Sequence, residues 1–149
     1  MKFRIYTDTS VIGGCFDPEF REWSNQLLED FASGENIIVL SDLTLRELEL
    51  APETVLQRIQ DIPDTYVEYV DLSAEAKSLA EKYIAEGALS EQNVVDAQHI
   101  AMATIHRVDL LVSWNFKHIV HFLKVRQFNA VNLKYGYPTL EIRSPQEVV

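Results

Sequence analysis

The stretch VVDAQHIAMATIHRVDLLVSWN, residues 94–115, decides the fold because it joins a helix to a buried strand and carries polar groups at both ends. Its apolar residues recur at helical spacing up to Val108, with Asp96 in the first turn and His99 beside the apolar face. Residues 110–112 are continuously apolar, as in a parallel strand that is covered on both faces. We therefore expect Asn115 to emerge at the carboxyl end of a strand.

The chain before this stretch alternates strand and helix patterns. Strands are expected over residues 3–7, 37–40 and 66–72. Asp17 and Pro18 have the pattern of an N-cap and a first helical residue, and further caps are expected at Ser41 and Ser73. The helices are then expected over residues 18–33, 43–51, 53–62 and 74–86. This alternation predicts an α/β fold with a mostly parallel sheet and helices on both faces.

Length and composition favour one globular domain that spans residues 1–149. With 149 residues, of which 47% are hydrophobic, the chain can bury a full core. Its one cysteine, Cys15, can form no internal disulfide, which favours a reducing, cytoplasmic setting. No stretch approaches the roughly 18 consecutive apolar residues of a membrane span, and the N-terminus has no long apolar core. We expect neither secretion nor membrane insertion.

Charge is distributed unevenly along the chain. The net charge is −10, yet residues 97–149 hold six Lys and Arg against three Asp and Glu. An acidic total argues against non-specific binding to a polyanion, whereas a locally basic surface can still contact phosphates. These basic residues are equally compatible with ordinary solvated charges. The candidates for RNA contacts are Arg107, Lys117, Lys124, Arg126 and Lys134.

Four polar residues are expected at the carboxyl ends of the strands, where α/β sheets bind ligands: Asp8, Glu47, Asp96 and Asn115. Three carboxylates in one place repel one another unless a cation lies between them, which suggests a Mg²⁺ or Mn²⁺ site. Such a cation can bind a phosphate oxygen, activate water and stabilise a leaving oxygen, so phosphodiester hydrolysis is the chemistry indicated. The acids could instead be helix caps or solvated charges.

Four segments, taken together, resemble the PIN-domain family, in particular its VapC-like toxin branch. They are YTDTSVIGG, LSDLTLRELEL, DAQHIAMATIHRVDLLVSWNFKHI and YGYPTLEIRSPQEVV, in the same order and over nearly the whole chain. The resemblance implies a three-layer PIN-like fold with a central sheet of about four to five strands. It also implies a Mg²⁺- or Mn²⁺-dependent endoribonuclease, the toxin of a type II toxin–antitoxin pair, which forms a homodimer and binds a cognate antitoxin.

By position in the resemblance, Asp8, Glu47 and Asp96 match the first three acids of the family, which bind the metal. Asn115 falls where many members have a fourth acid. An amide can orient a ligand or accept a hydrogen bond from water but brings no charge. The sequence therefore does not decide whether one or two metal ions bind. We assign Asp8, Glu47 and Asp96 to the metal and Asn115 to an assisting role in catalysis.

Several neighbours of these four residues could support them. Ser10, His99 and Ser113 could form hydrogen bonds to the metal ligands, although the two hydroxyls fit turn caps and the histidine fits a structural role equally well. The other histidines, His106, His118 and His121, have no metal-ligand spacing and are expected to be surface or partly buried groups that could add to the basic patch. Trp114, Tyr135 and Tyr137 could stack on RNA bases, but large aromatics beside a sheet more often belong to the core.

Two other functions remain compatible with the residues. A PIN fold with a weakened site could act as a protein-binding module, which the uncharged Asn115 and the acidic N-terminal part favour. Divalent-metal affinity distinguishes this module from the nuclease. An α/β phosphotransfer domain with Asp8 as a covalent phosphate acceptor is the other alternative, and trapping a phospho-aspartate would support it.

Overall fold

A parallel sheet runs through the part of the chain that the computed structural model describes, residues 2–149. Its five strands are β1 (Arg4–Thr7), β2 (Ile37–Ser41), β3 (Val67–Val70), β4 (Leu110–Val112) and β5 (Ile142–Arg143). Their spatial order is β3-β2-β1-β4-β5, and every neighbouring pair is parallel. Strand β1 is central, with Tyr6 opposite Val39 of β2 and Leu111 of β4. The predicted parallel sheet is confirmed.

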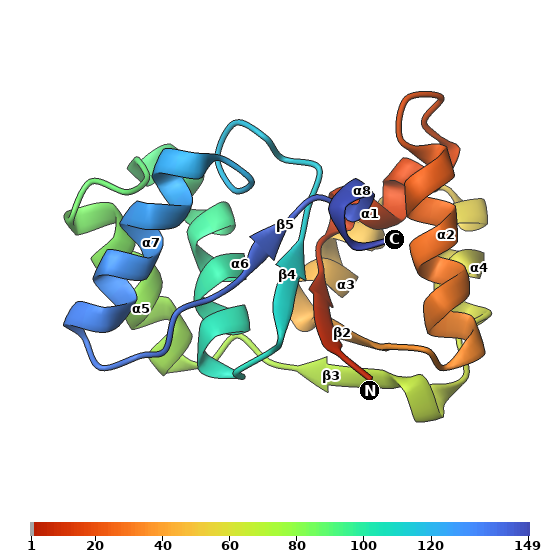
Figure 1. The fold of residues 1–149 in the computed structure, drawn as a ribbon, viewed down its shortest axis with the longest axis horizontal. Coiled ribbons are helices and arrows are strands. Elements are labelled where there is room, and N and C mark those ends of the chain that lie inside the picture. The colour runs from red at the N-terminus through yellow and green to blue at the C-terminus, as the bar shows by residue number, and fades with distance from the viewer. Residues whose placement is uncertain (1) are drawn as a thin grey trace.

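Helices flank this sheet on both faces (Figure 1). The α-helices are α1 (Thr9–Gly13), α2 (Arg21–Ser33), α3 (Asp42–Leu48), α4 (Glu53–Gln60), α5 (Ala74–Ala85), α6 (Val94–Ile105), α7 (Phe122–Lys134) and α8 (Pro145–Val148). Three short 3₁₀ turns are η1 (Gly14–Phe16), η2 (Asp64–Tyr66) and η3 (Glu91–Asn93). No helix within residues 2–149 is long and apolar enough to span a membrane.

Two hydrophobic cores lie on the two faces of the sheet. Tyr6 and Leu111 point into the core under α5, α6 and α7, whereas the adjacent Ile5 and Val112 point into the core under α1, α2 and α4. This alternation follows from the two-residue repeat of a strand, which sends successive side chains to opposite faces. Figure 1 shows the resulting three layers, with α5, α6 and α7 on one side of the sheet and α2, α4 and α8 on the other. The expected three-layer α/β architecture is confirmed.

Side-chain caps fix the starts of the two helices that follow β2 and β3. Ser41 ends β2 and accepts a hydrogen bond from the backbone N of Thr44 at 3.0 Å, so α3 begins directly at the carboxyl edge of the sheet. Ser73 caps α5 in the same way, through the backbone N of Ala76 at 3.1 Å. Both caps were expected from the sequence. Because α3 starts at this edge, Glu47 on its second turn stays close to it.

Several element bounds differ from those expected; for example, the helices expected over residues 43–51 and 53–62 end at Leu48 and Gln60. The helix expected from Pro18 begins at Arg21, because the Asp17 side chain accepts a hydrogen bond from the backbone N of Glu19 and holds residues 17–20 in a turn. The strand expected over residues 66–72 is limited to Val67–Val70. Helix α7 and strand β5 follow the last strand that the sequence pattern identified and were not expected individually.

Candidate active site

Asp8 lies directly after β1 and is buried, with a relative exposure of 5%. Its carboxylate accepts hydrogen bonds from the hydroxyls of Ser10 and Ser113, each at 2.6 Å, and from the backbone N of Val11 at 3.3 Å. Ser113 can reach it because β1 and β4 are neighbours, with Thr7 opposite Val112. Burial raises the pKa of Asp8, and the hydrogen bonds only partly oppose this shift. The charge of Asp8 is therefore held by neutral donors.

Asp96 lies in the first turn of α6, as the sequence predicted, and is partly buried. The Nδ1 atom of His118 lies 3.3 Å from its Oδ2 atom, and the Asn115 side chain lies near enough to lower the pKa of Asp96. Burial raises the pKa of Asp96 most strongly, and the nearby Glu47 adds to the rise. His118, His99 and Asn115 lower the pKa and oppose this effect.

Glu47 faces the same edge from α3, with its side chain 38% exposed. Its Oε1 atom accepts hydrogen bonds from Thr9 Oγ1 at 3.2 Å and from His99 Nε2 at 2.8 Å. Burial is the largest single effect and opposes ionisation of Glu47, but the hydrogen bond and charge of His99 and the hydrogen bond from Thr9 together outweigh it and lower the pKa below the ordinary value. Glu47 is therefore held as a carboxylate.

A buried tyrosine fixes the ring of His99. The Tyr6 hydroxyl lies 2.6 Å from His99 Nδ1 and donates to the Ser41 hydroxyl at 2.8 Å. Tyr6, Ser41 and His99 are exposed by 0%, 0% and 3% of their surfaces. Because a carboxylate can only accept, the His99 Nε2 atom that faces Glu47 carries a proton. The network runs from the core under α6 to the exposed Glu47.

The four predicted residues thus come together at one edge, but not as a preformed metal cage. Asp8, Glu47 and Asp96 each lie near enough to His99 for its charge to affect their pKa values. Within residues 2–149, no three acidic, histidine or cysteine side chains are grouped so that they could hold one ion. The donor set still suits a hard divalent cation, because its oxygens are carboxylates and Asp8 is buried against neutral partners.

Three residues of this network were not predicted from the sequence. His118 is partly buried, within what was expected, but its contact with Asp96 was not predicted; its backbone N donates to Asn115 Oδ1 at 2.9 Å and closes a tight turn that brings it there. An asparagine followed by a turn could have indicated this arrangement. Tyr6 lies within an expected strand and Thr9 directly after it. Nothing in the sequence distinguished them from ordinary strand and turn residues.

The predicted basic residues do not form one surface. Arg107 precedes β4, and its carbonyl accepts a hydrogen bond from the Arg4 guanidinium at the start of β1, so it lies at the amino edge, opposite Asp8. Lys134 at the end of α7 is paired with Glu86 at 2.7 Å. Lys124 and Arg126 lie on α7, where Lys124 donates to the carbonyl of Ala88 and Arg126 lies over the ring of Phe122. Of these five residues, only Lys117 lies in the loop after β4, two residues beyond Asn115.

The predicted aromatic residues are mostly engaged within the protein. Trp114 is buried, stacks on Phe20 at a centroid distance of 4.2 Å, and donates from its ring to Ser24. Tyr137 packs against the core under α5–α7, as expected for a core aromatic. Tyr135 is 38% exposed and donates its hydroxyl to Glu86. The buried Trp114 ring is therefore not available to stack on a base.

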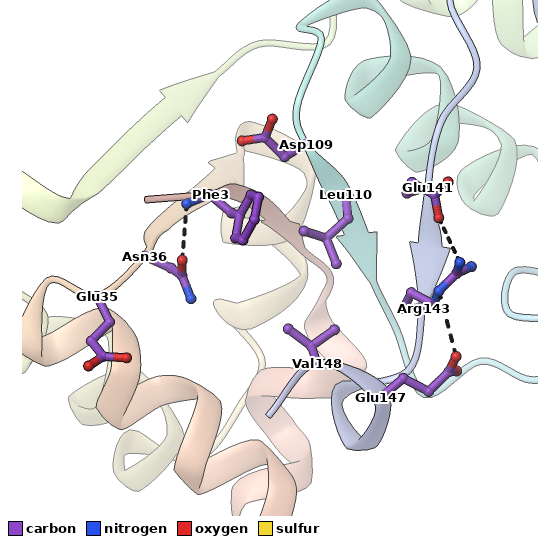
Figure 2. A pocket seen from close by; sticks show the side chains of 9 residues that line it. All are labelled: Phe3, Glu35, Asn36, Asp109, Leu110, Glu141, Arg143, Glu147 and Val148. Carbon is purple, nitrogen blue, oxygen red and sulfur yellow. Dashed lines mark hydrogen bonds and ion pairs between the residues drawn. The ribbon is translucent and has the colours of Figure 1, made fainter. Parts of the chain in front are cut away.

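A pocket of about 580 Å³ lies away from Asp8, Glu47 and Asp96. Figure 2 shows that Phe3, Asn36, Asp109 and Leu110, which precede or begin strands, line it together with residues of the C-terminal segment. Arg143 forms ion pairs there with Glu141 and Glu147. The pocket thus opens toward the amino ends of the strands and shares none of its lining residues with the candidate active site.

Comparison with known proteins places the fold. No protein-family model matches the sequence, and neither does any curated protein. Among solved structures, VapBC2 from Rickettsia felis, bound to a DNA fragment from its promoter, gives a TM-score of 0.58 at 19% identity and covers 95% of this chain and 98% of that chain. VapC20 from Mycobacterium tuberculosis, described as a sarcin-ricin loop cleaving toxin, gives 0.58 at 15% identity over 76% and 92% of the two chains.

A toxin–antitoxin complex from Klebsiella pneumoniae gives a TM-score of 0.54 at 21% identity, covering 76% of this chain and 88% of that chain. At these identities the similarity establishes the fold. The chain therefore has the PIN-like fold of VapC-type toxins, as the resemblance in sequence implied.

Proposed function

We propose that this protein is a Mg²⁺- or Mn²⁺-dependent endoribonuclease in which Asp8, Glu47 and Asp96 hold the divalent cation. The observation that carries the proposal is the environment of Asp8, a fully buried carboxylate with a raised pKa whose hydrogen-bond donors are two hydroxyls and one backbone amide. Burying a charge against neutral partners costs stability, and a divalent cation would offset that cost. The likeness to VapC20, described as a loop-cleaving toxin, supports RNA as the substrate.

Each residue around the cation would have a separate role. When bound, the cation would supply a Lewis acid for a phosphate oxygen and for the attacking water. Ser10 and Ser113 each donate to one oxygen of Asp8 and so fix the orientation of its carboxylate. His99 holds Glu47 ionised, and Asn115 orients Asp96 through its amide. Cleavage would follow at a phosphodiester bound beside these residues.

We further propose that the protein acts as the toxin of a type II toxin–antitoxin pair, binds a cognate antitoxin and forms a homodimer in the cytoplasm. The support is the match to structures described as VapBC, FitAB and toxin–antitoxin complexes. A buried free thiol at Cys15 fits a reducing compartment. Co-expression with the product of an adjacent gene, followed by size-exclusion chromatography with light scattering, tests both associations.

The experiment that tests the nuclease is cleavage of a panel of structured and single-stranded RNAs in Mg²⁺, Mn²⁺ or EDTA. We expect cleavage by the wild type in either metal, none in EDTA, and none by Asp96→Asn. The matched control is Asp71→Asn, which removes an exposed acid after β3 and should cleave as the wild type does. Cleavage that persists in EDTA, or in Asp96→Asn, would contradict the proposed role of the acids.

A protein-binding module is the second candidate, and one observation favours it. Each of the three acids already has a partner within the protein, and no group of three is arranged to hold an ion within the described residues 2–149. Titration of the protein with Mn²⁺ by calorimetry distinguishes the two functions. A nuclease site should bind Mn²⁺ and lose that binding in Asp8→Asn, whereas a binding module should show no Mn²⁺ affinity in either protein.

A further inference from the structure

An exposed aromatic side chain lies beside the candidate active site. Phe116 is 49% exposed and lies in the loop that follows β4. The residues on either side of this part of the loop, Asn115 and His118, both contact Asp96. Phe116 and the exposed Lys117 lie between them in sequence and are therefore close to Asp96, at the edge of the candidate active site.

The loop is held in place by its own hydrogen bonds. The carbonyl of Asn115 accepts from the backbone N of Ile119 at 3.1 Å and of Val120 at 2.8 Å, while Asn115 Oδ1 accepts from His118 N. The backbone N of Phe116 donates to the carbonyl of Trp114 at 3.0 Å. Phe116 is thus presented to solvent on an ordered turn, so it loses little conformational freedom when it binds a ligand.

Phe116 is also the outer end of a row of aromatic rings. Its ring lies 6.0 Å from that of Trp114, which stacks on Phe20 at 4.2 Å with an interplanar angle of 17°. Trp114 is buried, so the inner part of the row is packed, while the outer ring has a large exposed surface. A planar aromatic ligand that stacks on Phe116 would bury this surface and extend the row.

The neighbouring chemistry identifies that ligand. A phosphodiester positioned at Asp96 would have a nucleotide next to the loop, and Lys117 offers a cation for an adjacent phosphate. An unpaired base can stack on an aromatic side chain, whereas a base within a duplex is already stacked on both faces. We propose that Phe116 stacks on an unpaired base of the substrate while Lys117 contacts a flanking phosphate, so that the protein selects single-stranded RNA. This inference rests on the proposed ribonuclease function.

The experiment uses an unstructured RNA that contains one 2-aminopurine, whose fluorescence is quenched when it stacks. Stopped-flow mixing in Mg²⁺ records the quenching before cleavage, and initial rates give KM. We expect quenching by the wild type, a 5- to 150-fold rise in KM and loss of quenching in Phe116→Ala, and recovery of both in Phe116→Trp. The matched control is Phe122→Ala, which removes another exposed aromatic from the start of α7 and should behave as the wild type does.

The two proposals fail in different ways. If Phe116→Ala quenches and cleaves as the wild type does, or if the wild type prefers duplex RNA, base stacking on Phe116 is overturned while the nuclease stands. If the wild type quenches 2-aminopurine through Phe116 but cleaves no RNA in any metal, the stacking site stands and the nuclease is overturned. If Phe116→Ala retains RNA binding and loses binding to a protein partner, the ring belongs to a protein interface and the inference is wrong.

Discussion

Replacement of Tyr6 by phenylalanine tests the network that positions His99 and Glu47. The substitution removes one hydroxyl from a ring that is completely buried between β1 and α6. That hydroxyl donates to Ser41 at 2.8 Å and lies 2.6 Å from His99 Nδ1. Ser41 keeps its hydrogen bonds with Thr44, so the group left without its partner is the Nδ1 atom of a histidine that is 3% exposed.

The magnitude follows from that orphaned atom. A buried polar group that loses its partner costs about 1–3 kcal/mol, and a phenyl ring is no harder to bury than a phenol. We therefore expect Tyr6→Phe to lower the free energy of unfolding by about 2 kcal/mol. For a chain of this length such a loss lowers the melting temperature by about 4–8 °C. Urea denaturation followed by circular dichroism measures the free energy, and a thermal melt measures the temperature.

A matched control separates the network from the loss of any tyrosine hydroxyl. Tyr69 lies on the edge strand β3 and is 58% exposed, so Tyr69→Phe should change the free energy of unfolding by less than about 0.5 kcal/mol. If Tyr6→Phe changes stability no more than Tyr69→Phe does, His99 does not depend on Tyr6, and our explanation of how Glu47 is held would be refuted.

Three further outcomes are expected. Asp96→Asn should abolish cleavage but lower the free energy of unfolding by less than about 1 kcal/mol in urea, because burial already disfavours the charge of Asp96; a larger loss would indicate a structural cap. Arg4 lowers the pKa of Glu68 below its ordinary value of 4.5, so the ion pair stabilises the native state above pH 4.5 and loses this effect as the pH falls further. In Glu68→Gln, the free energy of unfolding should therefore fall less steeply with decreasing pH than in the wild type. Gly34→Ala should destabilise by more than about 1 kcal/mol, because its φ is +82° and a Cβ would lie 2.4 Å from a tyrosine ring, whereas Gly13→Ala, with open space around it, should not.

The fold could be predicted from the sequence where local and tertiary signals agree. The hydrophobic run at β4 and the caps at Ser41 and Ser73 each predicted a boundary that the structure has. The start of α2 was mispredicted because Asp17 is satisfied by a local turn as readily as by a helix. Helix α7 gave a weak signal because Phe122 and Leu123 at its start are exposed and blur its apolar face.

The candidate site was predictable to the extent that it depends on strand ends. In a parallel sheet the carboxyl ends share one edge, so residues that follow β1 and β4 had to meet, and Asp8 and Ser113 do. Contacts between side chains from different elements were not accessible in this way. The pairing of His118 with Asp96 depends on how a turn folds back. The position of Arg107, by contrast, could have been predicted, because a residue that precedes β4 lies at the amino edge of the sheet, away from Asp8.

Asp8 occupies a position that was predictable from the sequence but that, on stability alone, is unfavourable for a carboxylate. Burial raises the pKa of its carboxyl, so at neutral pH the ionised side chain is less favourable in the folded chain than in the unfolded chain. An apolar or amide side chain would avoid that cost, yet the sequence places two serines where their hydroxyls hold the carboxylate. The divalent cation that we propose would supply the positive charge that this buried acid lacks within the protein. The same edge of the sheet that gives β1 and β4 their neighbours therefore provides the argument for the cation.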